Sequence, residues 1–314
     1  MKFTLASALA AFVSIAFAQQ GSPQGYASLN GGTTGGKGGA VVTVTTLDAL
    51  NAALGKKTDT TAKIIRISGL IKGSSKVYVG SNKSLIGANS GSGLEGIGLQ
   101  LTKSKNVIIQ NLKISKVVAS NGDGIGIQES TNVWVDHVDI SNDITHDKDY
   151  YDGLIDVTHA ADFVTISNTY FHDHFKGSLV GHSDSNGAED TGHLRVSYIN
   201  NYWKNVGSRT PSVRFGTAHI VNNFYDGIFT SGIDTRQKAQ VLVESTAFVG
   251  VAKPLGTYNG DVAGFAVVKD VNFGTGANTA ARGTLTSAPY SVAAVGSANV
   301  KAAVVGKAGN TLTL

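Results

Sequence analysis

Acidic residues gather in the middle of the chain, where they could hold a cation. The chain has 22 Asp and Glu residues, and the segments 116–131, 141–162 and 172–194 hold a large share of them, including Asp123, Asp143, Asp147, Asp149, Asp152, Asp156, Asp162 and Asp173. Clustered carboxylates repel one another unless they are solvated, protonated or bridged by a cation. Oxygen ligands in a chain without cysteine favour a hard cation, above all Ca²⁺. The cluster therefore indicates either a calcium site or a solvated acidic surface.

Two arginines follow this acidic region in the segment Arg209-Thr210-Pro211-Ser212-Val213-Arg214. A turn is expected here, because Pro211 biases Thr210 toward an extended conformation and lacks a backbone donor. The arginines could be structural counter-ions of the carboxylates. They could instead bind an anionic substrate, because the guanidinium fork matches a carboxylate. Lys176 precedes them by about one unit of the repeat described next.

A sequence repeat is expected to position these residues. Two apolar residues at a spacing of two are followed by a small polar residue and a further apolar residue, as in Val107-Ile109-Asn111-Ile114. The polar position recurs at residues 111, 137, 168, 200, 222, 245 and 270, in steps of 22 to 32 residues. This period is typical of a solenoid, it is too short for a propeller blade, and the longer steps indicate loops inserted on one face. The sequence therefore predicts an all-β, single-stranded parallel β-helix.

The polar position of the repeat is expected to face inward. Four of its members are asparagines that would form an internal ladder of hydrogen-bonded amides: Asn111, Asn168, Asn200 and Asn222. His137 occupies the same position, so Trp134, Asp136 and His137 are interpreted as a buried structural cluster rather than an acid–base pair. His172 and His174 alternate like metal ligands but lack a third partner.

The ends of a solenoid need caps, because the terminal rungs expose core. Residues 46–55 predict an N-terminal capping helix, with Thr46 as N-cap and Gly55 as the stop. Residues 274–314 lack the repeat and are expected to run back along the outside. No linker is evident, which predicts one domain from residue 19 to residue 314.

Composition excludes several other classes of protein. The chain has 39 Gly, 4 Pro and no Cys, 15% charged residues and a net charge of +4. A disulfide framework and a thiolate zinc site are impossible without cysteine. Collagen needs glycine at every third position, and disorder needs lower hydrophobicity than the 41% found here. The lysines are scattered and form no basic patch, so no nucleic-acid partner is expected.

Residues 1–18 are interpreted as a secretory signal peptide. Lys2 supplies the positive end, residues 5–17 the apolar core, and Ala16-Phe17-Ala18 the cleavage site. The apolar run is too short for a transmembrane span of about 20 residues. We therefore expect a secreted, extracellular protein without a membrane partner.

Three motifs resemble those of the pectate lyases of polysaccharide lyase family 1, of the fungal type. The segment 132–137, which reads NVWVDH, resembles the family's WxDH signature. Arg209-xPxx-Arg214 resembles its catalytic arginine motif, and the segment 30–36 resembles a common N-terminal motif. Order and spacing match from about residue 26 to residue 250. The resemblance implies a right-handed parallel β-helix (a pectate lyase-like solenoid) that cleaves polygalacturonate by Ca²⁺-dependent β-elimination.

The resemblance also implies roles for six residues. Asp123, Asp152 and Asp156 match calcium ligands, Lys176 and Arg214 match substrate-binding positions, and Arg209 matches the proton-abstracting base. A guanidinium is ordinarily charged, so a base at this position would need positive charge nearby to give up its own proton. In a straight strand Asp152 and Asp156 would be about 13 Å apart. The chain is therefore expected to bend at Gly153 if both bind one ion.

Three alternatives remain open at this point. A pectin lyase would act on methylated pectin without Ca²⁺, but Asp152 and Asp156 favour the pectate enzyme. A polygalacturonase needs an acid and a base about 6.5–9.5 Å apart, and the Asp-Asp pair usual in such enzymes is absent from the sequence. A non-catalytic, wall-binding β-solenoid would not need Lys176, Arg209 and Arg214. The expected partner is polygalacturonate or pectin, bound by a monomer.

Overall fold

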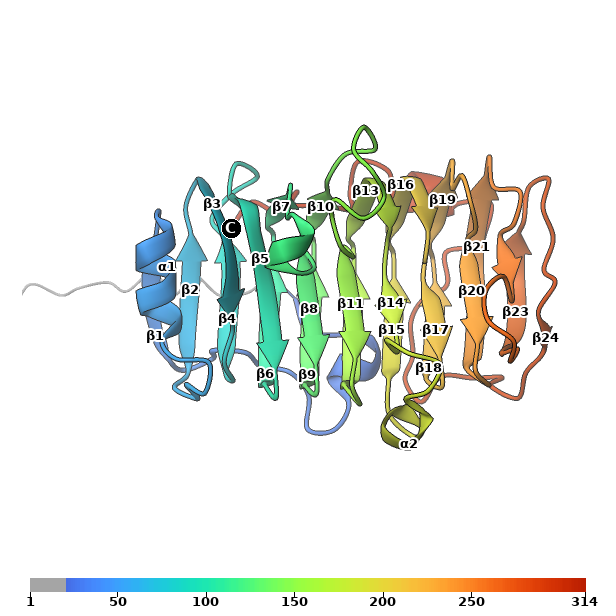
Figure 1. Ribbon diagram of the computed structural model, residues 1–314, viewed down its shortest axis with the longest axis horizontal. Helices are drawn as coiled ribbons and strands as arrows, with labels where there is room; N and C mark the ends of the chain where they lie inside the picture. Colours follow the sequence, from blue (N-terminus) through green and yellow to red (C-terminus); the bar gives the residue numbers. More distant parts are fainter. Residues whose placement is uncertain (1–20) are drawn as a thin grey trace, which may run out of the picture.

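The strands of the chain wind into a solenoid whose rungs stack along the long axis of the molecule (Figure 1). The computed structural model describes residues 21–314, so the interpretation of residues 1–18 as a signal peptide lies outside the described residues. The solenoid has about ten turns, and its strand pairs between rungs are parallel. The prediction of an all-β, right-handed parallel β-helix is confirmed. No helix in the described part of the chain is long and apolar enough to cross a bilayer.

Each turn of the solenoid adds strands to three parallel stacks, which we call sheets A, B and C. Sheet A contains β1 (Ala40–Val44), β2 (Lys63–Ile67), β4 (Lys83–Gly87), β6 (Lys105–Gln110), β9 (Thr131–Asp136), β12 (Asp162–Ser167), β15 (Arg195–Ile199), β18 (Thr217–Val221), β21 (Gln240–Val249), β23 (Phe265–Asn272) and β24 (Ala281–Arg282). Sheet B contains β3 (Leu70–Tyr78), β5 (Gly93–Thr102), β7 (Lys113–Ser115), β10 (Asp139–Ser141), β13 (Tyr170–Lys176), β16 (Tyr202–Ser208) and β19 (Phe224–Asp226), followed by the far ends of β21 and β23. Sheet C begins with the far ends of β3 and β5 and continues with β8 (Ile125–Gln128), β11 (Ile155–Thr158), β14 (Leu179–Val180), β17 (Ser212–Arg214), β20 (Ile233–Arg236) and β22 (Leu255–Gly256).

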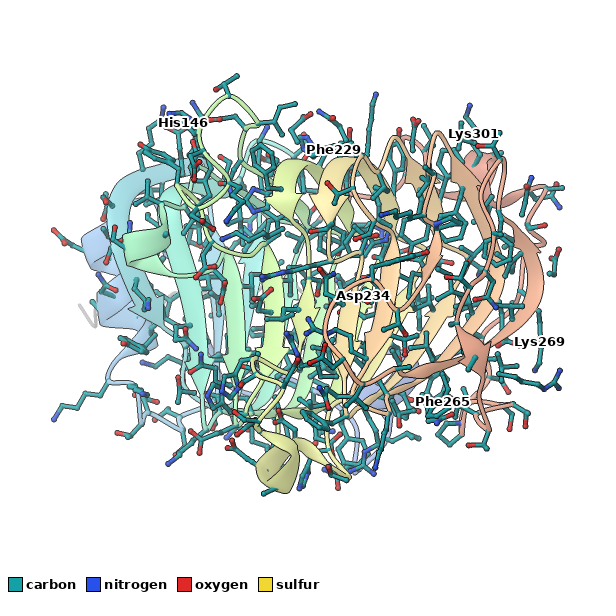
Figure 2. The ribbon with its side chains drawn as sticks, turned by 45° about the vertical axis from the view of Figure 1, so that its right-hand side comes forward. His146, Phe229, Asp234, Phe265, Lys269 and Lys301 are labelled. Atoms are coloured by element: carbon teal, nitrogen blue, oxygen red, sulfur yellow. The ribbon has the colours of Figure 1, made fainter. Side chains whose placement is uncertain are left out.

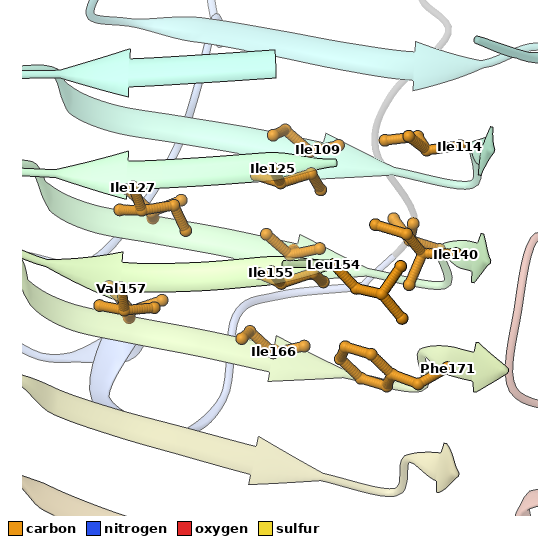
Figure 3. Close-up of a cluster of buried hydrophobic side chains, with 14 of the residues drawn as sticks. Ile109, Ile114, Ile125, Ile127, Ile140, Leu154, Ile155, Val157, Ile166 and Phe171 are labelled. Atoms are coloured by element: carbon orange, nitrogen blue, oxygen red, sulfur yellow. The ribbon is translucent and has the colours of Figure 1, made fainter. Parts of the chain in front are cut away.

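The core is built from apolar columns that run from rung to rung. In sheet B, Ile114, Ile140 and Phe171 occupy the same register on consecutive rungs, and all three are fully buried (Figure 3). The column continues as an aromatic stack, in which the ring of Trp203 lies 3.8 Å from that of Phe171 and 5.8 Å from that of Tyr225. Such columns bury apolar surface and add about 0.5–1.5 kcal/mol per aromatic pair, which stabilises a chain without disulfides.

The turn from sheet A to sheet B accounts for the polar position of the repeat. All seven residues there adopt the left-handed conformation, with φ between 46° and 57°. Asparagine tolerates this conformation better than most residues, because its short side chain can bond locally. The seven positions are Asn111, His137, Asn168, Asn200, Asn222, Ser245 and Asp270.

The structure differs from the predicted internal ladder in two respects, the direction in which some of the side chains point and one of the members. The amides of Asn222, Asn200 and Asn168 do bond in series, with Nδ2 to Oδ1 distances of 3.0 and 3.3 Å. Asn168 and Asn200 are only half-buried, however, because the left-handed residue carries the chain round the corner. The next residue on the rung, such as Asn201, faces the core instead and is fully buried. Asn111 stands apart from the ladder and bonds to the backbone of Leu312.

The caps follow the prediction. Helix α1 (Leu47–Leu54) covers the first rung, Thr46 Oγ1 accepts from the N–H of Ala49, and Gly55 ends the helix with a φ of 76°. After β24 the chain returns along the outside, so its C-terminus lies beside the early rungs (Figure 1). This tail contains α3 (Val300–Val304) and covers the asparagine ladder, where Ala293 O accepts from Asn222 Nδ2 at 2.9 Å.

The N-terminal segment forms a second strap along a different turn. Residues 21–39 include the short helix η1 (Gly25–Ser28) and lie along the turn from sheet C to sheet A. Asn106 Oδ1 accepts from the N–H of Gly35, and Asn132 Nδ2 donates to the carbonyl of Leu29. The turn from sheet B to sheet C is covered by neither strap.

Candidate active site

The residues singled out in the sequence converge on the turn from sheet B to sheet C. One inserted loop, residues 142–154, lies in this turn between β10 and β11, and a second, residues 181–194, leads from β14 in sheet C to β15 in sheet A. The second is shorter than the predicted 172–194, because β13 extends to Lys176 and β14 follows at Leu179. Figure 2 shows His146, on the first loop, and Phe229, on a later rung, along the same edge of the solenoid. Helix η2 (Ala119–Asn121) lies in the turn from sheet B to sheet C, whereas α2 (Gly187–Asp190) lies on the second loop, at the opposite edge of the solenoid (Figure 1).

Asp123 and Asp156 lie on either side of Gly153. The N–H of Gly153 donates to Asp123 Oδ1 at 3.0 Å. A Cβ at Gly153 would lie 2.5 Å from Asp156 Oδ1 and 2.7 Å from Oδ2. The chain bends at Leu154, one residue after the position expected, and glycine is needed at position 153 because a side chain would occupy the place of the carboxylate. Gly126, the strand neighbour of Asp156, is similarly close to Asp123, since its Cβ would lie 3.2 Å from Asp123 Oδ2.

The two carboxylates destabilise each other's charged form. Burial raises the pKa of Asp156 to about 6, the charge of Arg209 acts in the opposite direction, and Asp152 raises it further. Burial and the charges of Asp156 and Asp152 raise the pKa of Asp123 well above its usual range. In each carboxylate, Oδ1 accepts one backbone N–H, from Gly153 or Leu179. A pair of buried, mutually repelling carboxylates is a place that a cation would stabilise.

The third predicted ligand is not assembled with the other two. The side chain of Asp152 is 47% exposed, and its Oδ1 lies 3.4 Å from Lys176 Nζ. Lys176 Nζ also lies 3.3 Å from Asp149 Oδ1. Within residues 21–314, no three His, Asp or Glu side chains are arranged as a ready metal centre. Asp152 therefore faces a lysine at the rim, while Asp123 and Asp156 lie deeper.

A buried histidine holds the backbone of Asp152 in place. His174 Nε2 lies 2.6 Å from the carbonyl oxygen of Asp152, and His174 Nδ1 lies 3.4 Å from Asn142 Nδ2. Asn142 in turn accepts from the N–H of Val117. Burial lowers the pKa of His174 to about 4, so the ring is neutral at pH 7 and its Nε2–H donates to Asp152. Sequence analysis missed this role, because Asp173 is left-handed (φ 49°) and reverses the alternation of β13.

Arg209 stands at the corner of the next rung. It is left-handed (φ 57°) and precedes a cis Thr210-Pro211 bond, and its carbonyl accepts from the N–H of Ser178 at 2.6 Å. Its side chain is half-buried and close enough to Asp156 to act on the pKa of that carboxyl. Arg209 makes no ion pair with the described part of the chain. The guanidinium therefore lies within electrostatic reach of Asp156 without forming an ion pair with a described residue.

Arg214 projects from β17 and is held by the second loop. Its Nε donates to Asp184, and its Nη1 donates to the carbonyl of Gly181 at 2.8 Å. Asp184 also bonds to Arg236 on the neighbouring strand β20. Arg214 therefore has a structural counter-ion, as one alternative expected, but this counter-ion is Asp184 on the loop 181–194 rather than one of the eight aspartates named from the sequence. No sequence pattern indicated Asp184.

His137 and His172 lie away from this turn. Asp136 is buried, as expected, and accepts from Ser167, Asn168 and His137. The side chain of His137 is 19% exposed, which corrects the prediction that it is buried, because its left-handed backbone turns it outward. His172 and His174 face opposite ways, and His172 bonds to Asp139 and Asp173. They therefore cannot bind one metal together.

Known proteins share both the sequence and this architecture. A family model described as pectate lyase matches residues 1–312. A probable pectate lyase A of Neosartorya fischeri is 61% identical over 92% of this chain and 88% of its own length, and pectate lyase A of Aspergillus niger is 56% identical over the same shares. The solved pectate lyase of Bacillus sp. N165 in complex with trigalacturonate is 30% identical, covers 92% of this chain and 98% of its own, and has a TM-score of 0.83. The fold and the sequence agree, and the chain belongs to the pectate lyase family of polysaccharide lyases.

Proposed function

We propose that this pectate lyase is a secreted, calcium-dependent enzyme that cleaves (1→4)-α-D-galacturonan by β-elimination. The observation that carries the proposal is the pair Asp123 and Asp156, whose charges repel each other beside Gly153, with Arg209 close enough to act on Asp156 without an ion pair of its own. Lys176 and Arg214 lie on the same side of the solenoid, at the edges of the same site. The complex of the Bacillus sp. N165 enzyme with trigalacturonate supports the class of substrate.

The donor set fits Ca²⁺. Asp123, Asp156 and Asp152 would hold the ion, because carboxylate oxygens are its preferred ligands and the raised pKa values of Asp123 and Asp156 signal uncompensated negative charge. Asp152 is exposed at the rim and bonds to Lys176 at the long distance of 3.4 Å, so it can exchange that partner. When bound, Ca²⁺ would supply charge neutralisation for the carboxylate of the reacting galacturonate and so acidify its C5 proton.

Side chains of the protein would bind the substrate and accept its proton. Lys176 and Arg214 would bind carboxylates of neighbouring sugars and fix the register of the chain. Arg209 would accept the C5 proton. The electrons of the C5–H bond then form the C4–C5 double bond, the C4–O bond breaks, and the leaving oxygen takes up a proton. One product carries a 4-deoxy-4,5-unsaturated galacturonosyl end.

A single assay tests this function. Purified protein is incubated with polygalacturonate, with added Ca²⁺ or with EDTA, and the ultraviolet absorbance of the unsaturated product is followed. We expect absorbance to rise with Ca²⁺ and to stop with EDTA. A rise that survives EDTA and prefers methylated pectin would indicate a pectin lyase. Chain shortening without absorbance would indicate a hydrolase, and binding without either would indicate a wall-binding solenoid.

Secretion has its own test, because it depends on residues 1–18. We expect the mature protein to begin near Gln19 in the culture medium of a fungal host, as determined by N-terminal sequencing or mass spectrometry. Retention of the full-length chain inside the cells would contradict the proposal. Size-exclusion chromatography with light scattering tests the expectation that the enzyme acts as a monomer.

A further inference from the structure

Arg214 is one of two arginines bridged by a single carboxylate. Arg214 and Arg236 are direct neighbours on strands β17 and β20, and both side chains are 11% exposed. Asp184, on the loop 181–194, accepts from Arg214 Nε and from Arg236 Nη2, with its Oδ1 and Oδ2 at 2.9 and 2.8 Å from the latter. Gly260 closes one side of this arrangement, since a Cβ there would lie 2.9 Å from Asp184 Oδ2.

The negative charge of the Asp184 carboxylate offsets the repulsion between the guanidinium groups of Arg214 and Arg236. Neighbouring strands are about 4.8 Å apart, so two guanidiniums side by side repel each other. Burial raises the pKa of Asp184, but its bonds to Arg214 and the charge of Arg236 outweigh that effect, and the net shift of the pKa is downward. The carboxylate is therefore ionised at neutral pH, and it holds both guanidiniums.

The same contacts determine which nitrogen of the Arg214 guanidinium remains available to bind a ligand. Nε is used by Asp184 and Nη1 by the carbonyl of Gly181, at 2.8 Å. Nη2 has no hydrogen-bond acceptor among residues 21–314, and it is the donor left for a ligand outside the chain. The orientation of Arg214 thus depends on a loop that is remote in sequence.

We propose that Asp184 is a positioning residue, which bridges Arg214 to Arg236 and so fixes Arg214 for binding a substrate carboxylate. This inference rests on the proposed function, because it assigns Arg214 to a galacturonate. Asp184 itself is not expected to touch the substrate. Loss of Asp184 would let the guanidinium of Arg214 rotate out of this orientation. Binding of the substrate in the ground state and in the transition state would weaken alike.

The test compares steady-state kinetics of Asp184→Asn with the wild type on polygalacturonate. The amide keeps the shape and removes the charge, so we expect KM to rise about fivefold, with kcat within about twofold. Asp184→Glu should restore part of the loss. The rise should shrink on highly methylated pectin, because an ester offers Arg214 no carboxylate. A merely structural role would not depend on methylation in this way.

Glu189→Gln is the matched control. Glu189 lies on the same loop, is exposed, and bonds to Asn186 rather than to an arginine. Both substitutions remove one negative charge, so a general effect on attraction of a polyanion would appear in both. A KM for Asp184→Asn equal to or below that of Glu189→Gln would overturn the proposal, and a fall would show that Asp184 competes with the substrate.

Failure of this inference can be told apart from failure of the proposed function. If the wild type released no unsaturated product, the proposed function would be wrong, and calorimetric binding of trigalacturonate would still test Asp184. Weaker binding by Asp184→Asn than by Glu189→Gln supports the positioning role, and equal binding contradicts it. Thermal unfolding of each variant verifies that the fold is retained.

Discussion

The Cα of Gly153 packs directly against the carboxylate of Asp156, so closely that a methyl group on it would lie 2.5 Å from Oδ1. Gly153→Ala should therefore displace this carboxylate and weaken Ca²⁺ binding at least about tenfold. The added methyl group would overlap the buried carboxylate of Asp156, and only a movement of one of them relieves the overlap. Calorimetric titration with Ca²⁺ and activity at limiting Ca²⁺ measure the effect. Gly91→Ala is the control, since Gly91 is exposed and near only the flexible side chain of Asn89. Unchanged Ca²⁺ affinity in Gly153→Ala would remove Asp156 from the metal site.

Arg209→Lys tests the base. We expect turnover of polygalacturonate to fall by at least about 100-fold, which is the lower range for loss of a general base. Binding of Ca²⁺ and the midpoint of thermal unfolding should stay near the wild-type values, because Arg209 makes no ion pair within the described chain. Arg282→Lys, at an exposed position of β24, controls for the exchange itself. Near-normal turnover in Arg209→Lys would refute its assignment as the base.

His172 should make stability depend on pH. Burial lowers the pKa of His172, but hydrogen bonds to Asp139 and Asp173 outweigh this effect, and the net shift of the pKa is upward. A group with a raised pKa in the folded state contributes stability that is complete below its unfolded pKa, about 6.5, and is lost as pH rises through the folded value. The free energy of unfolding should therefore exceed that of His172→Gln most at about pH 6, and less at about pH 9. Urea titrations at both pH values measure the difference, and a gap that widens with pH would contradict the charged bridge.

Asn222 joins the asparagine ladder to the C-terminal strap. Its Nδ2 donates to Asn200 and to the carbonyl of Ala293, and its Oδ1 accepts from the N–H of Val295. Asn222→Ala should lower the free energy of unfolding by about 2 kcal/mol, because it removes three hydrogen bonds that tie the strap to the ladder. The slope of the urea titration should not change. Asn51→Ala, on the exposed face of α1, should change stability by less than about 0.5 kcal/mol. A similar loss in both variants would argue against the strap.

The fold could be predicted because the spacing of apolar residues in the sequence repeat follows from the geometry of each rung. Residues such as Ile109 and Ile114 recur at the spacing that two inward strand positions and a corner impose. The direction of the side chain at the corner could not be predicted in the same way. A left-handed residue such as Asn200 or Asp173 shifts the alternation by one position, and its conformation is not readable from residue type alone.

The candidate site could be predicted as a set of residues but not as a set of contacts. The resemblance assigned Asp123 and Asp156 to one site, and both carboxylates lie beside Gly153 in the structure. It could not show that Asp152 would face Lys176, because the conformation of an exposed loop depends on partners such as His174. Asp184 reaches Arg214 across 30 residues, and no pattern links the two.

The two straps imply an order in which the parts of the molecule fold. Contacts between rungs join residues about one repeat apart, whereas Tyr26 bonds to Ser197 at a separation of 171 residues and Asn111 to Leu312 at 201. Rungs can therefore form while the chain is still being synthesised, but the C-terminal strap can close only after the last residue has been added. Bonds formed so late contribute little to the rate of folding and much to the slowness of unfolding. An enzyme secreted as proposed, without disulfides and beyond the reach of chaperones, would depend on that kinetic persistence.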